Sequence, residues 1–123
     1  MIKVVICDDS ATCRELLAGI LEADPEIQVI GIARDGIEAV QLTRKLRPDV
    51  VTMDIHMPRM SGLEATRNIM MLAPTPVIIV STRMEFEAEV ATQNGLGAGA
   101  LLVLEKPRAP QVLLTRCCDC HMR

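Results

Sequence analysis

The chain has 123 residues, half of them hydrophobic, and a formal net charge of −3 at pH 7. This length fits a single domain with a buried core, and no apolar run approaches the roughly 20 residues of a membrane span, so we expect no membrane partner. Phe86 is the only aromatic residue and the basic residues are scattered, which argues against nucleic acid as a partner.

Short apolar runs alternate with helix-length segments along the whole chain. The runs are rich in Val and Ile and are bounded by Gly, Pro, Asp or Ser, a pattern typical of buried strands. They occupy residues 2–7, 27–33, 50–53, 76–80 and 101–104. Helices are predicted over about 10–24, 35–46, 63–72, 85–94 and 110–120. This alternation predicts an open α/β domain with a parallel sheet.

Acidic residues and one lysine lie where predicted strands end. Asp8 and Asp9 follow the first run, Asp54 follows the third, and Lys106 comes just after the fifth. Ligands of parallel sheets bind outside the carboxyl ends of the strands, so we expect these four residues to share one edge. Carboxylates about 4 Å apart repel by roughly 4 kcal/mol per pair at an effective dielectric of ~20. The arrangement therefore calls for a cation.

Four motifs together resemble the receiver domain of bacterial response regulators. They are Cys7-Asp8-Asp9-Ser10, the segment DIHMPRMSG from Asp54 to Gly62, Ser81 after an apolar run, and Lys106-Pro107. The resemblance extends to about Leu114 and implies a flavodoxin-like, doubly wound, five-stranded parallel sheet of order 2-1-3-4-5 with five flanking helices. We expect the receiver domain to cover residues 1–116, followed by a Cys-rich tail at 117–123.

The resemblance implies a role for each residue at this edge. Asp54 would be the nucleophile that accepts a phosphoryl group, since a carboxylate can attack phosphorus once charge on the phosphate oxygens is neutralised. Mg²⁺ prefers oxygen ligands, and the expected ones are the side chains of Asp8, Asp9 and Asp54 and the backbone carbonyl of His56. Lys106 and Ser81 would contact the phosphoryl oxygens.

Further positions are expected to govern the switch and its lifetime. New bonds from a phosphoryl group to Ser81 and Lys106 would pull loops inward. Receivers usually carry an aromatic residue three positions before the lysine, whereas this chain has Val103, which cannot report by the same rotation. His56 and Arg83 are candidates for setting the lifetime of the phosphoryl group, although His56 equally fits a solvent-facing loop residue.

Three further segments resemble receivers that precede the chemotaxis protein-glutamate methylesterase domain. They are the run from Asp54 to Ala65, Leu21 to Pro25, and Arg47 to Thr52, although Ser61 stands where Asp is common. The resemblance implies a chemotaxis-type histidine kinase as phosphoryl donor and a methylesterase domain as effector. No nucleophile-elbow motif is present, so we expect this chain to catalyse only its own phosphorylation and dephosphorylation.

Two other classes of protein are alternatives. An aspartyl-phosphate phosphatase of the haloacid dehalogenase type would also use an aspartate nucleophile, but such enzymes usually show Asp-x-Asp, and here His56 occupies the third position of that motif. A degenerate or stand-alone receiver that acts only as a protein interaction module would not require the complete set of site residues.

The end of the chain carries a cluster of cysteines. Cys117, Cys118 and Cys120 with His121 contain the Cys-x-x-Cys-His pattern of haem attachment and also resemble a zinc site, while a frayed helix end with reduced thiols is the simpler interpretation. The total of five cysteines is odd and forms no disulfide framework. We therefore expect a reducing, cytoplasmic location.

Overall fold

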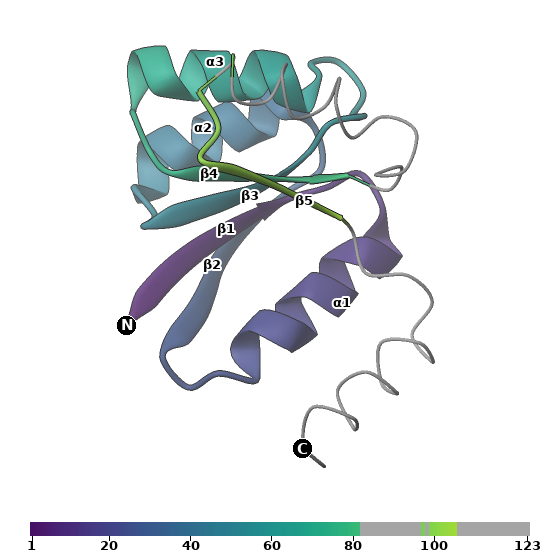
Figure 1. Cartoon of the computed structure of the whole chain (residues 1–123), viewed down its shortest axis with the longest axis vertical. Helices are drawn as coiled ribbons and strands as arrows, with labels where there is room; N and C mark the ends of the chain where they lie inside the picture. The colour runs from purple at the N-terminus through teal and green to yellow at the C-terminus, as the bar shows by residue number, and fades with distance from the viewer. Residues whose placement is uncertain (82–96, 98, 106–123) are drawn as a thin grey trace.

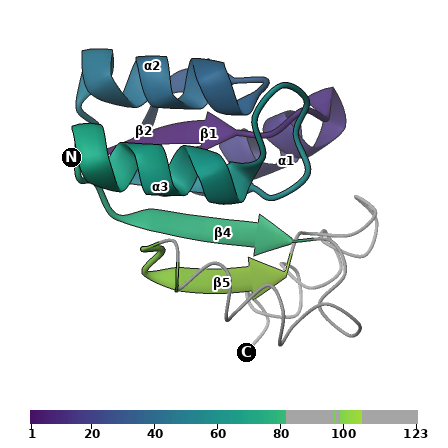
Figure 2. The ribbon, with the colours of Figure 1, turned by 90° about the horizontal axis from the view of Figure 1, so that it is seen from above.

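The computed structural model describes residues 1–81, 97 and 99–105. These residues form a five-stranded sheet of order β2-β1-β3-β4-β5, in which every neighbouring pair of strands is parallel. The arrows drawn for β1, β4 and β5 point the same way (Figure 2). The predicted fold class and strand order are confirmed. The strands are β1 (Ile2–Cys7), β2 (Ile27–Ala33), β3 (Val50–Asp54), β4 (Val77–Ser81) and β5 (Leu102–Glu105).

Helices cover both faces of the sheet. Helix α1 (Ala11–Glu22) lies on one face, and α2 (Gly36–Leu46) and α3 (Gly62–Leu72) lie side by side on the other (Figure 1). The helices predicted over about 85–94 and 110–120 lie outside the described residues. Among the residues that are described, no helix combines the length and the apolar character needed to cross a bilayer.

Each of the three helices begins at a residue whose side chain caps it. The Ser10 hydroxyl accepts a hydrogen bond from the Cys13 amide at 3.3 Å, and the Asp35 carboxylate accepts one from the Glu38 amide at 2.8 Å. Ser61 caps α3 through the amide of Glu64 at 3.2 Å. Such caps each contribute about 1 kcal/mol to stability, because they satisfy amides that have no partner within the helix.

The main core lies between the sheet and the α2/α3 layer. Its side chains are aliphatic, sulfur-containing or alanine, and the largest fully buried ones on the strands include Val5, Val51, Met53 and Ile79. Val51 and Met53 alternate with Thr52 and Asp54 along β3, and therefore point to the α2/α3 face. This packing fixes β3, and with it the position of Asp54 at its carboxyl end.

Candidate functional site

Three carboxylates meet at the carboxyl edge of the sheet. Asp8 and Asp9 follow β1, and Asp54 is the last residue of the neighbouring strand β3. Each offers one oxygen, and these oxygens all lie within 4.8 Å of one another. Asp8 and Asp54 are buried, with 1% and 5% of their surface exposed, whereas Asp9 is exposed. The cluster thus combines two charges withdrawn from water with one at the surface.

The buried pair carries an electrostatic cost. At the 4.8 Å limit of separation, two unit charges repel by about 3.5 kcal/mol at an effective dielectric of ~20. Burial gives Asp8 and Asp54 less screening by solvent than a surface pair would have. A cation bound between them would replace this repulsion with attraction.

The loop after β1 holds Asp8 in place through its backbone and its side chain. The Asp8 amide donates to the carbonyl of Ala33 on β2 at 3.0 Å, and one carboxylate oxygen accepts from the Ser10 amide at 2.9 Å. The Arg14 guanidinium on α1 donates to the Asp8 carbonyl at 2.8 Å. Sequence reasoning missed Arg14, whose spacing from Asp8 gives no signal that its side chain would turn back to this loop.

The donor atoms fit Mg²⁺. All three are carboxylate oxygens, which suit a hard divalent ion. Mg²⁺ keeps several waters in its octahedral shell, so each of these oxygens can bind the ion directly or through a retained water. Exposure of Asp9 leaves room for those waters.

The thiol next to the cluster has a different character. Cys7 is 1% exposed, and burial, with smaller contributions from the charges of Glu38 and Asp8, raises the pKa of its thiol far above the usual value. The thiolate is the nucleophilic and metal-binding form of cysteine. Cys7 therefore acts as a small buried apolar group rather than as a ligand or nucleophile.

The loop between β3 and α3 folds back on the end of β3. The Gly62 amide donates to the carbonyl of Ile55 at 2.8 Å, and a Cβ at Gly62 would overlap the carbonyl oxygen of Asp54. Ile55 and Met57 are buried while His56 between them is exposed. The side chain of His56 thus lies at the surface, as in the alternative interpretation of that residue, and its backbone lies in the turn that follows Asp54.

The structure describes only some of the other predicted site residues. Ser81 is the last residue of β4, one position beyond Val80, which pairs with Asp54 across the sheet. Val103 on β5 is partly buried and packs against the main core. Lys106 and Arg83 lie outside the described residues, as does the cluster formed by Cys117, Cys118, Cys120 and His121.

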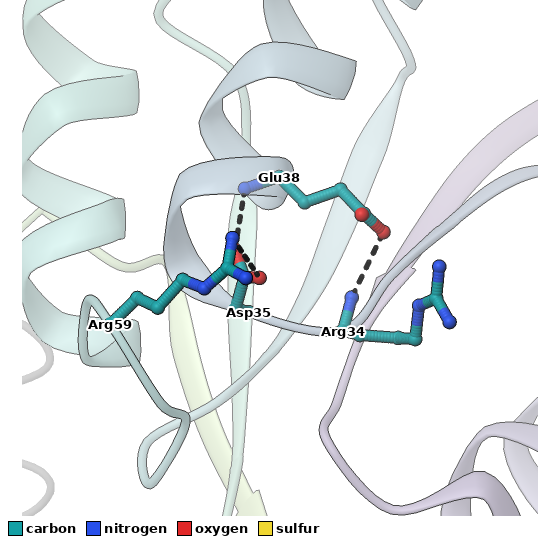
Figure 3. Close-up of polar contacts among 4 residues, drawn as sticks. All are labelled: Arg34, Asp35, Glu38 and Arg59. Carbon is teal, nitrogen blue, oxygen red and sulfur yellow. Dashed lines mark hydrogen bonds and ion pairs between the residues drawn. The ribbon is translucent and has the colours of Figure 1, made fainter.

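One ion pair near the site had no counterpart in the sequence analysis. Arg59, in the β3–α3 loop, lies with its Nη1 3.7 Å from Oδ2 of Asp35, the residue that caps α2 (Figure 3). Asp35 was recognised only as a helix start, and nothing in the sequence links it to a residue so far along the chain. Arg59 also has a positive φ of 68°, which the sequence Pro-Arg-Met does not predict.

Comparisons with known proteins place this arrangement in a family. The family model described as the response regulator receiver domain matches residues 4–117. A protein-glutamate methylesterase/protein-glutamine glutaminase from Myxococcus xanthus is 53% identical over 110 residues, which are 89% of this chain and 31% of that protein. A relative of the same description from Pyrococcus horikoshii is 50% identical over 106 residues, 86% of this chain and 28% of its own length. The chain thus spans about a third of the length of these curated relatives.

Solved structures agree with the fold and with the sequence relationship. The response regulator domain of CheB from Thermotoga maritima superposes with a TM-score of 0.82 at 44% identity, covering 89% of this chain and 81% of that chain. A CheX–CheY complex with BeF₃ and Mg²⁺ from Borrelia burgdorferi gives a TM-score of 0.77 at 29% identity, covering 99% and 90%. This chain therefore belongs to the response regulator receiver domain family, and its sequence is of the type found in the CheB methylesterases of chemotaxis.

Proposed function

We propose that this chain is the phosphoacceptor switch of a chemotaxis two-component system, in which Asp54 accepts a phosphoryl group from a histidine kinase in the presence of Mg²⁺. The observation that carries the proposal is the cluster of carboxylates: the buried Asp54 ends β3 with Asp8 and Asp9 within 4.8 Å. The negative charge of a lone buried aspartate would repel an anionic phosphoryl group. Two acidic neighbours attract a divalent cation, which offsets this repulsion.

The transfer is a displacement at phosphorus. A carboxylate oxygen of Asp54 forms a bond to the phosphorus of a phosphohistidine, the bond from that phosphorus to the imidazole nitrogen breaks, and its electron pair stays on the imidazole. Bound Mg²⁺ would supply positive charge that offsets the charge on the phosphoryl oxygens. Rigid β3 packing keeps the Asp54 oxygen in position, which is the main protein contribution to such reactions.

The remaining roles are assigned to residues that match the family motif. We assign the ion to the side chains of Asp8, Asp9 and Asp54 and to the backbone carbonyl of His56. Lys106 and Ser81 would donate to the phosphoryl oxygens and so register the modified state. His56 and Arg83 would govern access of water to the acyl phosphate, and Val103 would transmit the change through its backbone, because valine has no long side chain to rotate.

The output is assigned from the curated relatives. These are methylesterases of which the chain covers about a third, so we propose a methylesterase domain as effector and a chemotaxis-type kinase as donor. The matched part contains the receiver, and the esterase chemistry would belong to the remainder of such a protein. We place the receiver at 1–116, the Cys-rich tail at 117–123, and the protein in the cytoplasm.

Intact mass measurement tests the proposal. The chain is incubated with Mg²⁺ and acetyl phosphate, and we expect one phosphoryl group on the wild type, none on Asp54→Asn, and none when EDTA is present. Asp24→Asn is the matched control, because Asp24 is an exposed aspartate outside the cluster, and it should be labelled like the wild type.

The same assay separates the alternative functions. Steady hydrolysis of varied phosphoesters, with little protein modified, would indicate a phosphatase. A chain that takes up no phosphoryl group from acetyl phosphate or from a phosphorylated histidine kinase would be a degenerate interaction module. Labelling of Asp54→Asn to the wild-type level would contradict the assignment of the acceptor.

A further inference from the structure

The β3–α3 loop is attached to the first turn of α2 at two adjacent points. Met60 packs so closely on Gly36 that a Cβ at Gly36 would lie 2.6 Å from the Cβ of Met60. Next to this contact, the Arg59 guanidinium faces the Asp35 carboxylate at 3.7 Å (Figure 3). The loop that follows the proposed phosphoacceptor is thus joined to an element that contributes nothing to the proposed chemistry.

Asp35 is the fixed partner of this ion pair. Its Oδ1 accepts from the Glu38 amide at 2.8 Å, so the carboxylate is held by the helix that it caps. The Glu38 carboxylate in turn accepts from the amide of Arg34 at 3.1 Å, which secures the chain just before the cap (Figure 3). The Asp35 side chain is 12% exposed and that of Arg59 is 70% exposed. The ion pair therefore holds Arg59 and its loop against the capped first turn of α2.

Arg59 needs such a contact because its backbone is strained. A φ of 68° is in the left-handed region, which residues other than glycine occupy at a cost and only where the surroundings hold them. Two hydrogen bonds span Arg59 and close the turn, one from the Met60 amide to the Pro58 carbonyl at 2.7 Å and one from the Gly62 amide to the Ile55 carbonyl at 2.8 Å. Release of Arg59 would loosen both.

We propose that the Asp35–Arg59 ion pair positions the metal site, by holding the β3–α3 loop closed so that the backbone of His56 stays in place beside Asp54. Asp35 and Arg59 are positioning residues and do not touch the ion. The inference rests on the proposed function, because it gives the loop a part in Mg²⁺ binding. The proposal adds Asp35, the residue that caps α2, to the residues on which Mg²⁺ binding depends.

Two matched substitutions distinguish positioning from simple electrostatics. Asp35→Asn keeps a good capping residue for α2 and removes the charge, and Arg59→Gln removes the other charge. If the pair acted only through its charges, loss of the positive charge would strengthen Mg²⁺ binding and loss of the negative charge would weaken it. If the pair holds the loop, both substitutions weaken binding.

Calorimetric titration of the full chain with MgCl₂ at low ionic strength measures the effect. We expect each single variant to bind Mg²⁺ roughly two- to fivefold more weakly, the range of a largely exposed ion pair. The double variant should be no weaker than the singles, because one interaction is lost in all three. Arg59→Lys keeps the charge, and should restore binding to near the wild-type level.

Amide hydrogen exchange without Mg²⁺ provides a second readout. The Gly62 amide, which bonds to Ile55, should exchange faster in Asp35→Asn and in Arg59→Gln by the same factor, and at the wild-type rate in Arg59→Lys. Opposite shifts in Mg²⁺ affinity, or unchanged affinity in both single variants, would overturn the inference.

If the proposed function is wrong, the calorimetric titration gives a different result. In that case the wild type itself would bind no Mg²⁺, whatever the loop does. The exchange data would then decide about the ion pair alone: faster Gly62 exchange in both single variants would show that it holds the loop, and unchanged exchange would show that it does not.

Discussion

Gly62 shows at the scale of one residue how tightly the site is built. Its Cα faces the backbone carbonyl of Asp54, and backbone atoms cannot move aside as a flexible side chain would. We expect Gly62→Ala to destabilise the fold by about 1–3 kcal/mol, the typical cost of overpacking. Urea unfolding followed by far-ultraviolet circular dichroism measures this, since the chain has no Trp or Tyr for fluorescence.

Gly19 provides the matched control for that substitution. It is exposed in the interior of α1, and a Cβ there would meet none of the residues that the structure describes within 4 Å. Gly19→Ala should therefore stabilise the chain by about 0.5–1 kcal/mol, because alanine loses less backbone entropy in a helix. Equal effects at the two positions would show that the contact with Asp54 does not limit the loop.

Cys7 makes the stability of the chain depend on pH in the alkaline range. In the unfolded chain its thiol ionises near the ordinary pKa of 9.0, whereas in the folded chain burial raises the pKa and keeps it protonated. The folded state then holds a proton that the unfolded state has lost. The free energy of unfolding contributed by Cys7 is therefore constant below about pH 9 and falls above it, by at most about 1.4 kcal/mol per pH unit.

Comparison with Cys7→Ala isolates this contribution. The variant loses packing at all pH values, but its free energy of unfolding should fall less steeply between pH 8 and 10 than that of the wild type. Parallel pH profiles for the two proteins would show that the Cys7 thiol has the same pKa in the folded and unfolded states.

The residues of the site differ in how readily the sequence reveals them. Asp8, Asp9 and Asp54 were predictable because each follows an apolar run, and parallel strands bring such positions to one edge. The Asp35–Arg59 contact was not, because it depends on the path of a loop and on a positive φ that no local pattern encodes.

The start of α3 shows how an element positions the loop before it. Ser61 caps the helix through the Glu64 amide, directly after the turn that packs on α2. Ser61→Ala should cost about 1 kcal/mol of stability, whereas Ser61→Asp should keep the cap and gain from its charge at the helix N-terminus. Chemical denaturation of the wild type and both variants tests this, and a Ser61→Ala variant as stable as the wild type would mean that the cap contributes nothing.

The boundaries of the five strands and of α1, α2 and α3 were predicted to within a residue or two, and the shifts have local causes. Strand β4 begins at Val77 rather than at Pro76, because proline has no amide to donate to a neighbouring strand. Helix α3 begins at Gly62 rather than at Leu63, because the Ser61 cap already allows helical geometry there. Strand β3 extends through Asp54, since that residue still pairs with Val80.

At the scale of the whole molecule, the carboxylate cluster predicts that folding is linked to Mg²⁺. An ion that binds only the folded chain at ten times its Kd adds about 1.4 kcal/mol to the free energy of unfolding. We expect a rise of several degrees in Tm with MgCl₂, and none with NaCl of equal ionic strength. Differential scanning calorimetry measures both.

Asp9→Asn is the informative variant for this linkage. It removes one charge from the cluster, so its Tm without Mg²⁺ should exceed that of the wild type, and its response to MgCl₂ should be lost or much reduced. Asp24→Asn should keep the full response. A response of wild-type size in Asp9→Asn would show that Mg²⁺ stabilises the chain from another site.

The fold of the molecule follows from its sequence more completely than its signalling does. Alternating strands and helices leave few topologies open, and the order β2-β1-β3-β4-β5 was among them. Which face transmits the signal depends on contacts with an effector, and these are not encoded in the periodicity of one domain. The receiver boundary at residue 116 and the role of Val103 stay predictions for the same reason.

Chemical mapping of the phosphorylated residue determines whether Asp54 is the phosphoacceptor. Borohydride reduces an acyl phosphate to the alcohol, so treatment of the phosphorylated chain should convert its aspartyl phosphate into homoserine, which peptide mass spectrometry can locate. We expect homoserine at position 54 and none at positions 8 and 9. Homoserine at position 8 or 9, or a phosphoryl group that resists borohydride on another residue type, would contradict this assignment.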